Sequence, residues 1–166
     1  TEDELAAVLS HELAHLSQRH FARSIGKQKS QSLTTLAAFL GSLLIMAAGD
    51  GEAGMAALSA TQAASIASQL SYSRTQEEEA DRIGMQTLVS AKRNPEAMAN
   101  MFDHLLAQTR YRTDIKEFAF LLTHPLTESR VSDAITKARQ LPKPIPQPQL
   151  NFELTKARAE FLNFKK

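Results

Sequence analysis

The 166-residue chain is long enough for one domain with its own hydrophobic core. Its 19 basic and 18 acidic residues give a net charge of +1 and are interspersed. This pattern excludes a nucleic-acid partner, because proteins that bind nucleic acid gather Lys and Arg in one patch. There is no cysteine, so a metal site must use histidine and carboxylate ligands rather than thiolates. Only 6% of the residues are aromatic and Ala and Leu are abundant, a composition that favours helices over strands.

The first predicted element is a helix from Thr1 to about Arg23. Thr1 suits the N-cap, and the acidic residues that follow it suit the first turn. Apolar residues at helical spacing predict its buried face: Leu5, Val8, Leu9, Leu13 and Leu16. The chain starts without Met or a signal peptide, so we interpret it as part of a longer protein.

A helical hairpin is predicted after a polar, basic connection at residues 24–32. Its arms are two apolar, Ala-rich segments, residues 33–48 and 52–70, which a Gly-Asp-Gly turn signal at 49–51 separates. The first arm is slightly shorter than the roughly 20 residues that a membrane span needs. Two interpretations follow: a hairpin buried in the core, or a surface that meets a membrane or a membrane-protein client.

The remainder of the domain is also predicted to be helical. A helix over residues 73–91 is followed by a second that starts at Asn94 and Pro95, since Asn caps helices and Pro suits their first turn. We expect its buried face to comprise Ala97, Met98, Met101, Phe102, Leu105 and Leu106. Two shorter helices are expected over residues 114–122 and 126–139.

Three segments divide the chain by composition. Residues 1–140 are predicted to form the core, and residues 141–150, with Pro at every second position from 142 to 148, an extended linker. Residues 151–166 have the pattern of an amphipathic helix that begins a further module.

The strongest motif is His11-Glu12-Leu13-Ala14-His15, which fits the pattern His-Glu-x-x-His. On a helix, residues four apart share one face, so both imidazoles can reach one ion. Zinc held by three protein ligands keeps one position for water, whose pKa it lowers to about 7. Glu12 stands between the two histidines, where a carboxylate can act as the general base.

A third ligand must come from elsewhere in the chain. The candidates are His20, His104, His124 and the acidic run at 77–81. On the predicted helix, Glu77 falls on the same small, apolar face as Ala80 and Gly84, and Asp81 lies one turn after Glu77. Two acids on one buried face need a nearby cation. The spacing alone leaves open that Glu77 is a solvated helix acid.

Three motifs in this order resemble one family. The motifs that carry the resemblance are His-Glu-x-x-His, then Glu77-x-x-Ala80-Asp81-x-x-Gly84 about sixty residues later, and then Thr123-His124-Pro125 with Arg130. With them, the chain resembles the gluzincin peptidases that include the CAAX prenyl endopeptidase and HtpX. The resemblance covers residues 1–140. It implies a mainly α, zincin-type metallopeptidase core in which the His-Glu-x-x-His helix packs against the Glu-x-x-Ala-Asp helix.

The resemblance also implies roles for single residues. His11, His15 and Glu77 would bind one zinc ion, and Asp81 would orient His11. His124 would lie near the metal, either to stabilise the oxyanion together with Arg130, which is close to the same site, or to cap the zinc in a latent state. His20 and His104 match nothing in the pattern. We expect both to be structural or exposed, and His20, nine residues after His11, to point away from the ligand face.

The apolar segment at 33–70 is shorter than the transmembrane helices that membrane-embedded relatives carry there, so the resemblance is greatest to the periplasmic, BepA-like branch. That branch implies a periplasmic endopeptidase followed by tetratricopeptide repeats, and a substrate-binding strand before the first motif. It further implies unfolded or misassembled protein substrates, the outer-membrane assembly machinery as a partner, and peripheral membrane contact through 33–70. The alternative is a chaperone-like client-binding module whose protease activity is latent.

Overall fold

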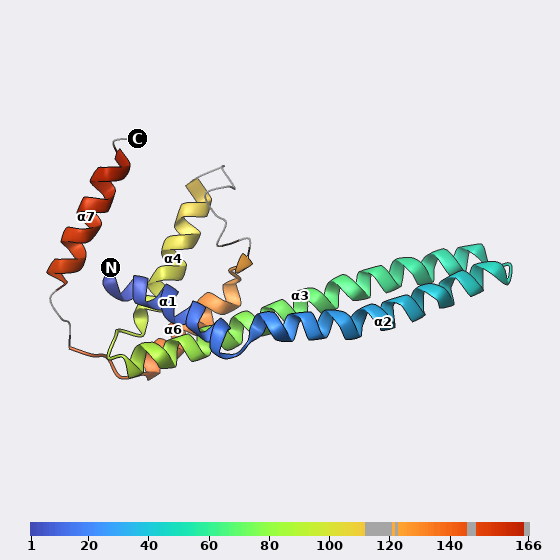
Figure 1. Cartoon of the computed structure of the whole chain (residues 1–166), viewed down its shortest axis with the longest axis horizontal. Helices are drawn as coiled ribbons and strands as arrows, with labels where there is room; N and C mark the ends of the chain where they lie inside the picture. Colours follow the sequence, from blue (N-terminus) through green and yellow to red (C-terminus); the bar gives the residue numbers. More distant parts are fainter. Residues whose placement is uncertain (112–120, 122, 146–148, 165–166) are drawn as a thin grey trace. The chain divides into compact units, whose positions relative to one another are not determined.

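Helices account for nearly all of the regular structure in the computed structural model, which describes residues 1–111, 121, 123–145 and 149–164 (Figure 1). No strand is found among these residues, and the predicted mainly α class is confirmed. The predicted helix at 114–122 falls almost entirely outside them. The helices are α1 (Glu2–Ser17), α2 (His20–Ala47), α3 (Gly51–Ser90), α4 (Glu96–Tyr111), α6 (Glu128–Gln140) and α7 (Leu150–Phe164).

Two units make up the chain. The first comprises residues 1–14 and 78–166, and the second comprises residues 15–77. The dividing points fall inside α1 and inside α3, and both helices run through them without a break. Two residues of one helix that lie one turn apart, such as His11 and His15 in α1, therefore keep ordinary helical spacing even though a dividing point falls between them.

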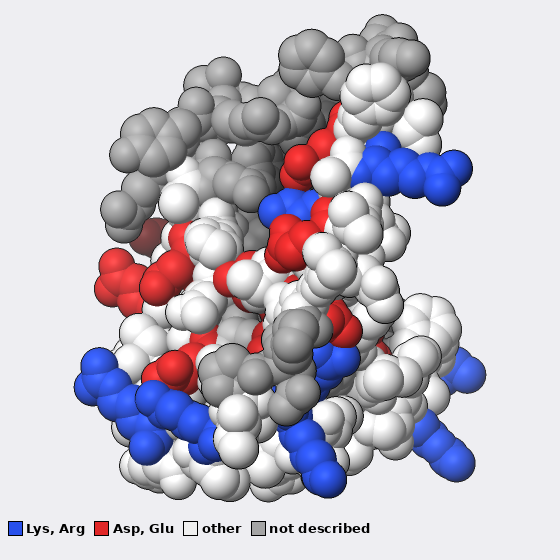
Figure 2. Space-filling view, turned by 90° about the vertical axis from the view of Figure 1, so that its left-hand side faces the viewer, with Lys and Arg blue, Asp and Glu red and all other residues white. Residues whose placement is uncertain are grey.

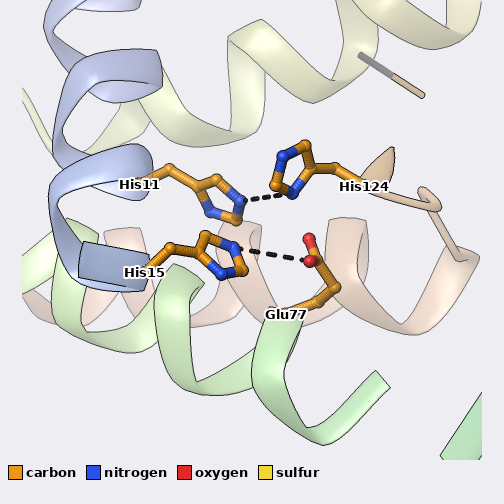
Figure 3. A group of neighbouring side chains, drawn as sticks. All are labelled: His11, His15, Glu77 and His124. Atoms are coloured by element: carbon orange, nitrogen blue, oxygen red, sulfur yellow. Dashed lines mark hydrogen bonds and ion pairs between the residues drawn. The ribbon is translucent and has the colours of Figure 1, made fainter. Parts of the chain in front are cut away.

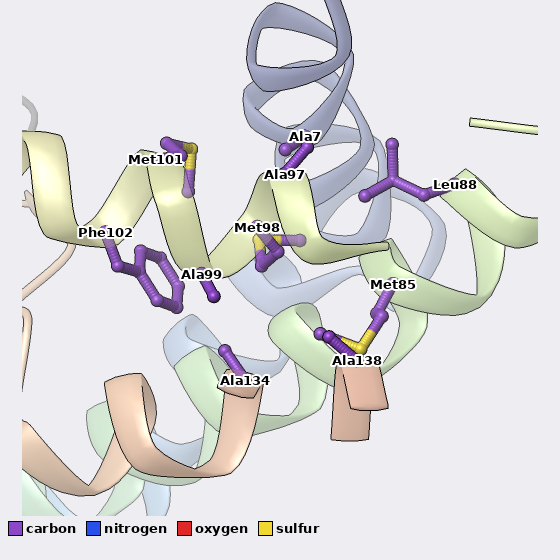
Figure 4. Packing of buried hydrophobic residues seen from close by; sticks show 10 residues of the cluster. All are labelled: Ala7, Met85, Leu88, Ala97, Met98, Ala99, Met101, Phe102, Ala134 and Ala138. Carbon is purple, nitrogen blue, oxygen red and sulfur yellow. The ribbon is translucent and has the colours of Figure 1, made fainter. Parts of the chain in front are cut away.

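Small residues and methionines dominate the core of the first unit (Figure 4). Phe102 and Met98 from α4 and Leu88 from α3 are its largest fully buried side chains. Helix α4 packs against α6. The buried cluster consists of Ala7, Met85, Leu88, Ala97, Met98, Ala99, Met101, Phe102, Ala134 and Ala138. The predicted inner face of α4 is confirmed, although Leu105 and Leu106 at its end are only half-buried.

Side-chain caps fix two of the predicted helix starts. Asn94 accepts a hydrogen bond on Oδ1 from the backbone N–H of Glu96 at 3.0 Å, as the sequence predicted for the start of α4. Thr127 accepts one on Oγ1 from the backbone N–H of Arg130 at 3.4 Å, so α6 begins two residues later than expected.

The predicted buried face of α1 is mostly wrong, although Val8 is partly buried against the core. Leu5, Leu9 and Leu13 are each about half exposed, and Leu16 is 74% exposed. The buried residues are instead Ala7, Ser10, His11 and Ala14. Small residues are buried here because they allow α1 to approach α3 closely. A Cβ atom added at Gly84 would lie only 3.1 Å from the backbone nitrogen of His11.

Replacing Gly84 with Val is expected to destabilise the protein by about 1–3 kcal/mol, since the added atoms would press on the backbone of His11 and on Met98. Gly26→Val is the matched control, because Gly26 is also helical but has no atom near the position of its missing Cβ. Denaturant unfolding of the two variants measures the difference. Equal stability would show that α1 can move away from α3 at little cost.

In the second unit, α2 and the first part of α3 form an antiparallel hairpin (Figure 1). Gly49 turns the chain with a positive φ of 100°, and Asp50 accepts a hydrogen bond on Oδ1 from the N–H of Ala53 at 2.9 Å. Further along, the Gln31 side chain donates to the carbonyl of Ser65 at 3.0 Å. The predicted hairpin and its turn are confirmed.

Two predicted boundaries in this unit are wrong. Residues 24–32 continue α2 instead of forming a connection, and residues 52–70 and 73–91 form one 40-residue helix, α3. Neither stretch contains proline, so nothing removes a backbone hydrogen bond and the helices continue through polar sequence. The break in the predicted first helix falls earlier, at Arg19, which has a left-handed φ of 53°.

The hairpin exposes many apolar side chains. Only 6% of the apolar part of α2 is buried, and the helix is long and apolar enough to cross a membrane, although length and composition alone are weak evidence for a span. The buried-core interpretation is therefore wrong for the described chain. Exposed apolar residues along the two arms include Leu33, Leu36, Leu40, Leu44, Met55, Ile66 and Leu70.

Charged side chains of both signs appear on the face in Figure 2, where neither sign covers the surface alone. This agrees with the interspersed charges of the sequence and the net charge of +1.

Candidate metal centre

Helix α1 presents both histidines of the motif from one face. His11 is fully buried and the side chain of His15 is 17% exposed. They lie one turn apart on a continuous helix, which is the spacing that lets two imidazoles reach a common point.

In the first unit, the ring of His11 is held between two partners. Its Nδ1 lies 2.9 Å from Oδ1 of Asp81, and its Nε2 lies 3.4 Å from Nδ1 of His124 (Figure 3). The other ring nitrogen of His124, Nε2, lies 3.4 Å from Oε1 of Glu12. His124 thus contacts both a candidate ligand and the candidate general base.

In the second unit, His15 also has a contact at each ring nitrogen. Its Nε2 lies 3.4 Å from Oε1 of Glu77 (Figure 3), and its Nδ1 lies 2.8 Å from Nδ1 of His20. Glu77 is 4% exposed, so it is not a solvated helix acid in this structure.

The donor atoms suit a zinc ion. His11, His15, Glu77 and His124 each offer one ligand atom, and these atoms all lie within 4.8 Å of one another. Two ligands held about 2.0–2.1 Å from a tetrahedral zinc stand about 3.3 Å apart. The pairs His11–His124 and His15–Glu77 both measure 3.4 Å, and neutral imidazole and carboxylate are donors that zinc accepts.

A buried ion pair supports Asp81. Arg130 donates from Nε to Oδ2 at 2.7 Å and from Nη2 to Oδ1 at 2.8 Å, and its Nη1 donates to the carbonyl of Pro125 at 2.7 Å. Its guanidinium also lies 5.1 Å from the centre of the Phe102 ring. These contacts give Arg130 the task of orienting Asp81, and its role at an oxyanion stays a prediction.

Burial raises the pKa of Asp81, but hydrogen bonds from Arg130 and His11 outweigh it and hold that pKa below its ordinary value. Asp81 therefore stays ionised at neutral pH and can accept the Nδ1 proton of His11. That bond leaves Nε2 of His11 as the nitrogen that can bind a metal.

The predicted orientation of His20 is wrong. His20 was expected to point away from the ligand face, but it is buried and in contact with His15. The error came from assuming one helix through Arg23. His104, by contrast, is an exposed residue that lies 3.3 Å from Glu4, as expected.

Comparison with known proteins identifies relatives. The sequence model of peptidase family M48 matches residues 1–138. The chain is 46% identical over 158 residues to the putative beta-barrel assembly-enhancing protease of Vibrio cholerae, and this match covers 95% of the chain and 32% of the relative. It is 41% identical over 157 residues to the beta-barrel assembly-enhancing protease of Escherichia coli, with the same two shares.

The match to the Yersinia pestis protein of the same name is 44% identical over 145 residues, covering 87% of the chain and 29% of the relative. The chain thus spans about a third of the length of these relatives. The family model and the motif agree on a zinc-dependent metallopeptidase core. The predicted resemblance is confirmed, and the chain belongs to peptidase family M48.

Proposed function

We propose that the protein is a zinc-dependent endopeptidase in which His11, His15 and Glu77 bind the metal and Glu12 is the general base. The observation that carries the proposal is the gathering of four donor atoms within 4.8 Å of one another. Two of them come from a motif with a carboxylate between its histidines, which suits a catalytic site better than a purely structural one.

When bound, zinc supplies a Lewis acid that polarises the scissile carbonyl and acidifies a water molecule. Glu12 accepts a proton from that water and later delivers it to the leaving amine. Asp81 holds the tautomer and orientation of His11. Arg130 keeps Asp81 in place through two parallel hydrogen bonds.

His124 supports the proposal that this conformation is latent. Catalytic zinc sites use three protein ligands and leave the fourth position for water or substrate. His124 supplies a fourth donor next to His11 and also lies against Glu12. We therefore assign it the role of a cap that has to leave before substrate binds.

Glu77→Ala tests the metal site. We expect zinc affinity to fall by more than the roughly 10–100-fold that loss of an outer partner costs, because a direct ligand is removed. Glu78→Ala is the control, since Glu78 is the exposed neighbour on the same helix. Metal content after dialysis and competition with a chromogenic chelator measure both variants. Unchanged zinc binding in Glu77→Ala would move the third ligand elsewhere and remove the basis of the proposal.

The relatives are named for enhancing beta-barrel assembly. We infer that the substrates are unfolded or misassembled envelope proteins in the periplasm, that the outer-membrane assembly machinery is a partner, and that residues 33–70 contact clients or the membrane surface. The exposed apolar side chains of the hairpin support this. Helix α7 (Leu150–Phe164) lies in the segment 151–166 that we propose leads into a further, tetratricopeptide-repeat module.

The same exposed hairpin favours a second function, a chaperone-like module that binds clients while its protease activity is latent. The two functions differ in their need for metal. Hydrolysis of an unfolded outer-membrane protein that stops when a chelator is added supports the protease. Suppressed aggregation of that substrate, without hydrolysis and regardless of the chelator, supports the chaperone.

A further inference from the structure

A second histidine contacts the metal site from outside. We infer that His20 is a positioning residue that accepts the Nδ1 proton of His15 and so fixes which nitrogen of His15 binds the metal. The inference rests on the proposed zinc site and assigns to it a residue that the His-Glu-x-x-His motif does not include.

The break between α1 and α2 brings His20 to this position. In one continuous helix, five residues turn the chain by about 500°, which would place His20 about 140° away from His15 around the axis. The backbone of Arg19 is instead left-handed, with φ 53° and ψ 39°, so the chain does not continue α1, and α2 starts at His20 in a new direction. The two rings then meet edge to face, with centroids 4.7 Å apart.

The direction of the hydrogen bond follows from the other nitrogen of His15. Its Nε2 faces Glu77 at 3.4 Å and is the atom available to a metal, so Nδ1 carries the proton. His20 Nδ1, at 2.8 Å, then has to accept that proton. His20 is therefore neutral, with its own proton on Nε2.

This arrangement makes the two motif histidines unlike each other. Histidines that bind metals usually donate their second N–H to a carboxylate, a backbone carbonyl or water. His11 follows that rule with Asp81, whereas His15 faces an imidazole. A charged acceptor raises the basicity of its histidine more than a neutral one does, so His20 orients His15 without adding a second negative charge beside Glu77.

The backbone of His20 is held by the same turn of α3 that carries Glu77. Gln76 donates from Nε2 to the carbonyl of His20 at 2.9 Å, and it accepts a bond on Oε1 from the hydroxyl of Ser24 at 3.1 Å. His20 itself is only 3% exposed. A surface histidine in chance contact would have no such anchors.

Two variants separate positioning from packing. His20→Leu fills most of the space without a polar atom, whereas His20→Asn keeps a carbonyl acceptor near the place of Nδ1. Zinc affinity, measured by chelator competition, should fall about 10–100-fold in the Leu variant and stay close to wild type in the Asn variant. His104→Leu, at an exposed histidine, is the control and should bind zinc like the wild type.

A second measurement does not depend on any variant. Nitrogen-15 NMR of the zinc-loaded wild-type protein should show His15 protonated on Nδ1, and His20 protonated on Nε2 with a bare Nδ1. The opposite tautomer of His20 would overturn the inference, even where the Leu variant fails to fold.

The outcomes also separate this inference from the proposed function. Wild-type zinc affinity in His20→Leu, together with lost zinc in Glu77→Ala, would refute positioning by His20 and leave the metal site standing. Equal losses in the Leu and Asn variants would likewise refute it, because an acceptor would then not be what matters. Zinc binding unchanged in both His20→Leu and Glu77→Ala would refute the proposed site itself.

Discussion

Glu12→Gln is expected to abolish proteolysis and to leave zinc in place. The amide has the shape of the carboxylate but cannot accept the proton of the water, and loss of a general base costs about 10²–10⁴-fold in rate. Glu12 is not among the four residues whose ligand atoms cluster. Its Oε1 is a buried atom that lies 3.4 Å from Nε2 of His124.

The experiment compares cleavage of an unfolded protein substrate with zinc content measured on the same preparations. Glu78→Gln, at an exposed position on α3, should keep both activity and metal. Wild-type cleavage by Glu12→Gln would overturn the role of Glu12. Loss of zinc along with activity would instead place Glu12 among the groups that hold the metal.

Arg130→Ala has the largest expected effect on stability, about 3–5 kcal/mol at neutral pH. The substitution removes two hydrogen bonds to Asp81 and leaves that carboxylate charged and largely buried. It also removes the bond to the carbonyl of Pro125. Arg82→Ala, at an exposed position on α3, should change stability by less than about 0.5 kcal/mol.

The effect of Arg130→Ala should depend on pH. The pKa of Asp81 is lowered in the folded protein, so its contribution to stability is present above the ordinary aspartate pKa of about 3.9 and is lost as pH falls through the lower folded value. The gap between wild type and variant should therefore narrow in strong acid. Denaturant unfolding of the metal-free proteins at neutral and acidic pH tests this, and a constant gap would show that the ion pair is not its source.

Local spacing allowed the core of the site to be predicted. His11 and His15 share a helical face whatever the rest of the chain does, and so do Glu77 and Asp81. The register of Glu77 with Ala80 and Gly84 favoured the buried position that the structure gives it, although the spacing alone had also allowed a solvated acid. Helix starts with a strong cap, as at Asn94, were predictable for the same reason.

Features that depend on neighbouring helices were not predictable. The Leu stripe of α1 is more apolar than the face of small residues that is buried. The small residues, however, allow α1 and α3 to pack as closely as they do at Gly84. The contact of His20 with His15 depends on a left-handed arginine, a conformation that non-glycine residues seldom adopt. No signal in a single sequence marks such a position.

The bond from Arg130 to the carbonyl of Pro125 bears on how the site can open. That carbonyl belongs to the residue directly after His124, and the guanidinium that holds it is itself fixed by Asp81. The chain is therefore pinned on the C-terminal side of His124. For the proposed opening, the imidazole of His124 can therefore turn away from His11 by rotation about the bonds of His124, while Arg130 keeps its bonds to Asp81, the partner of His11.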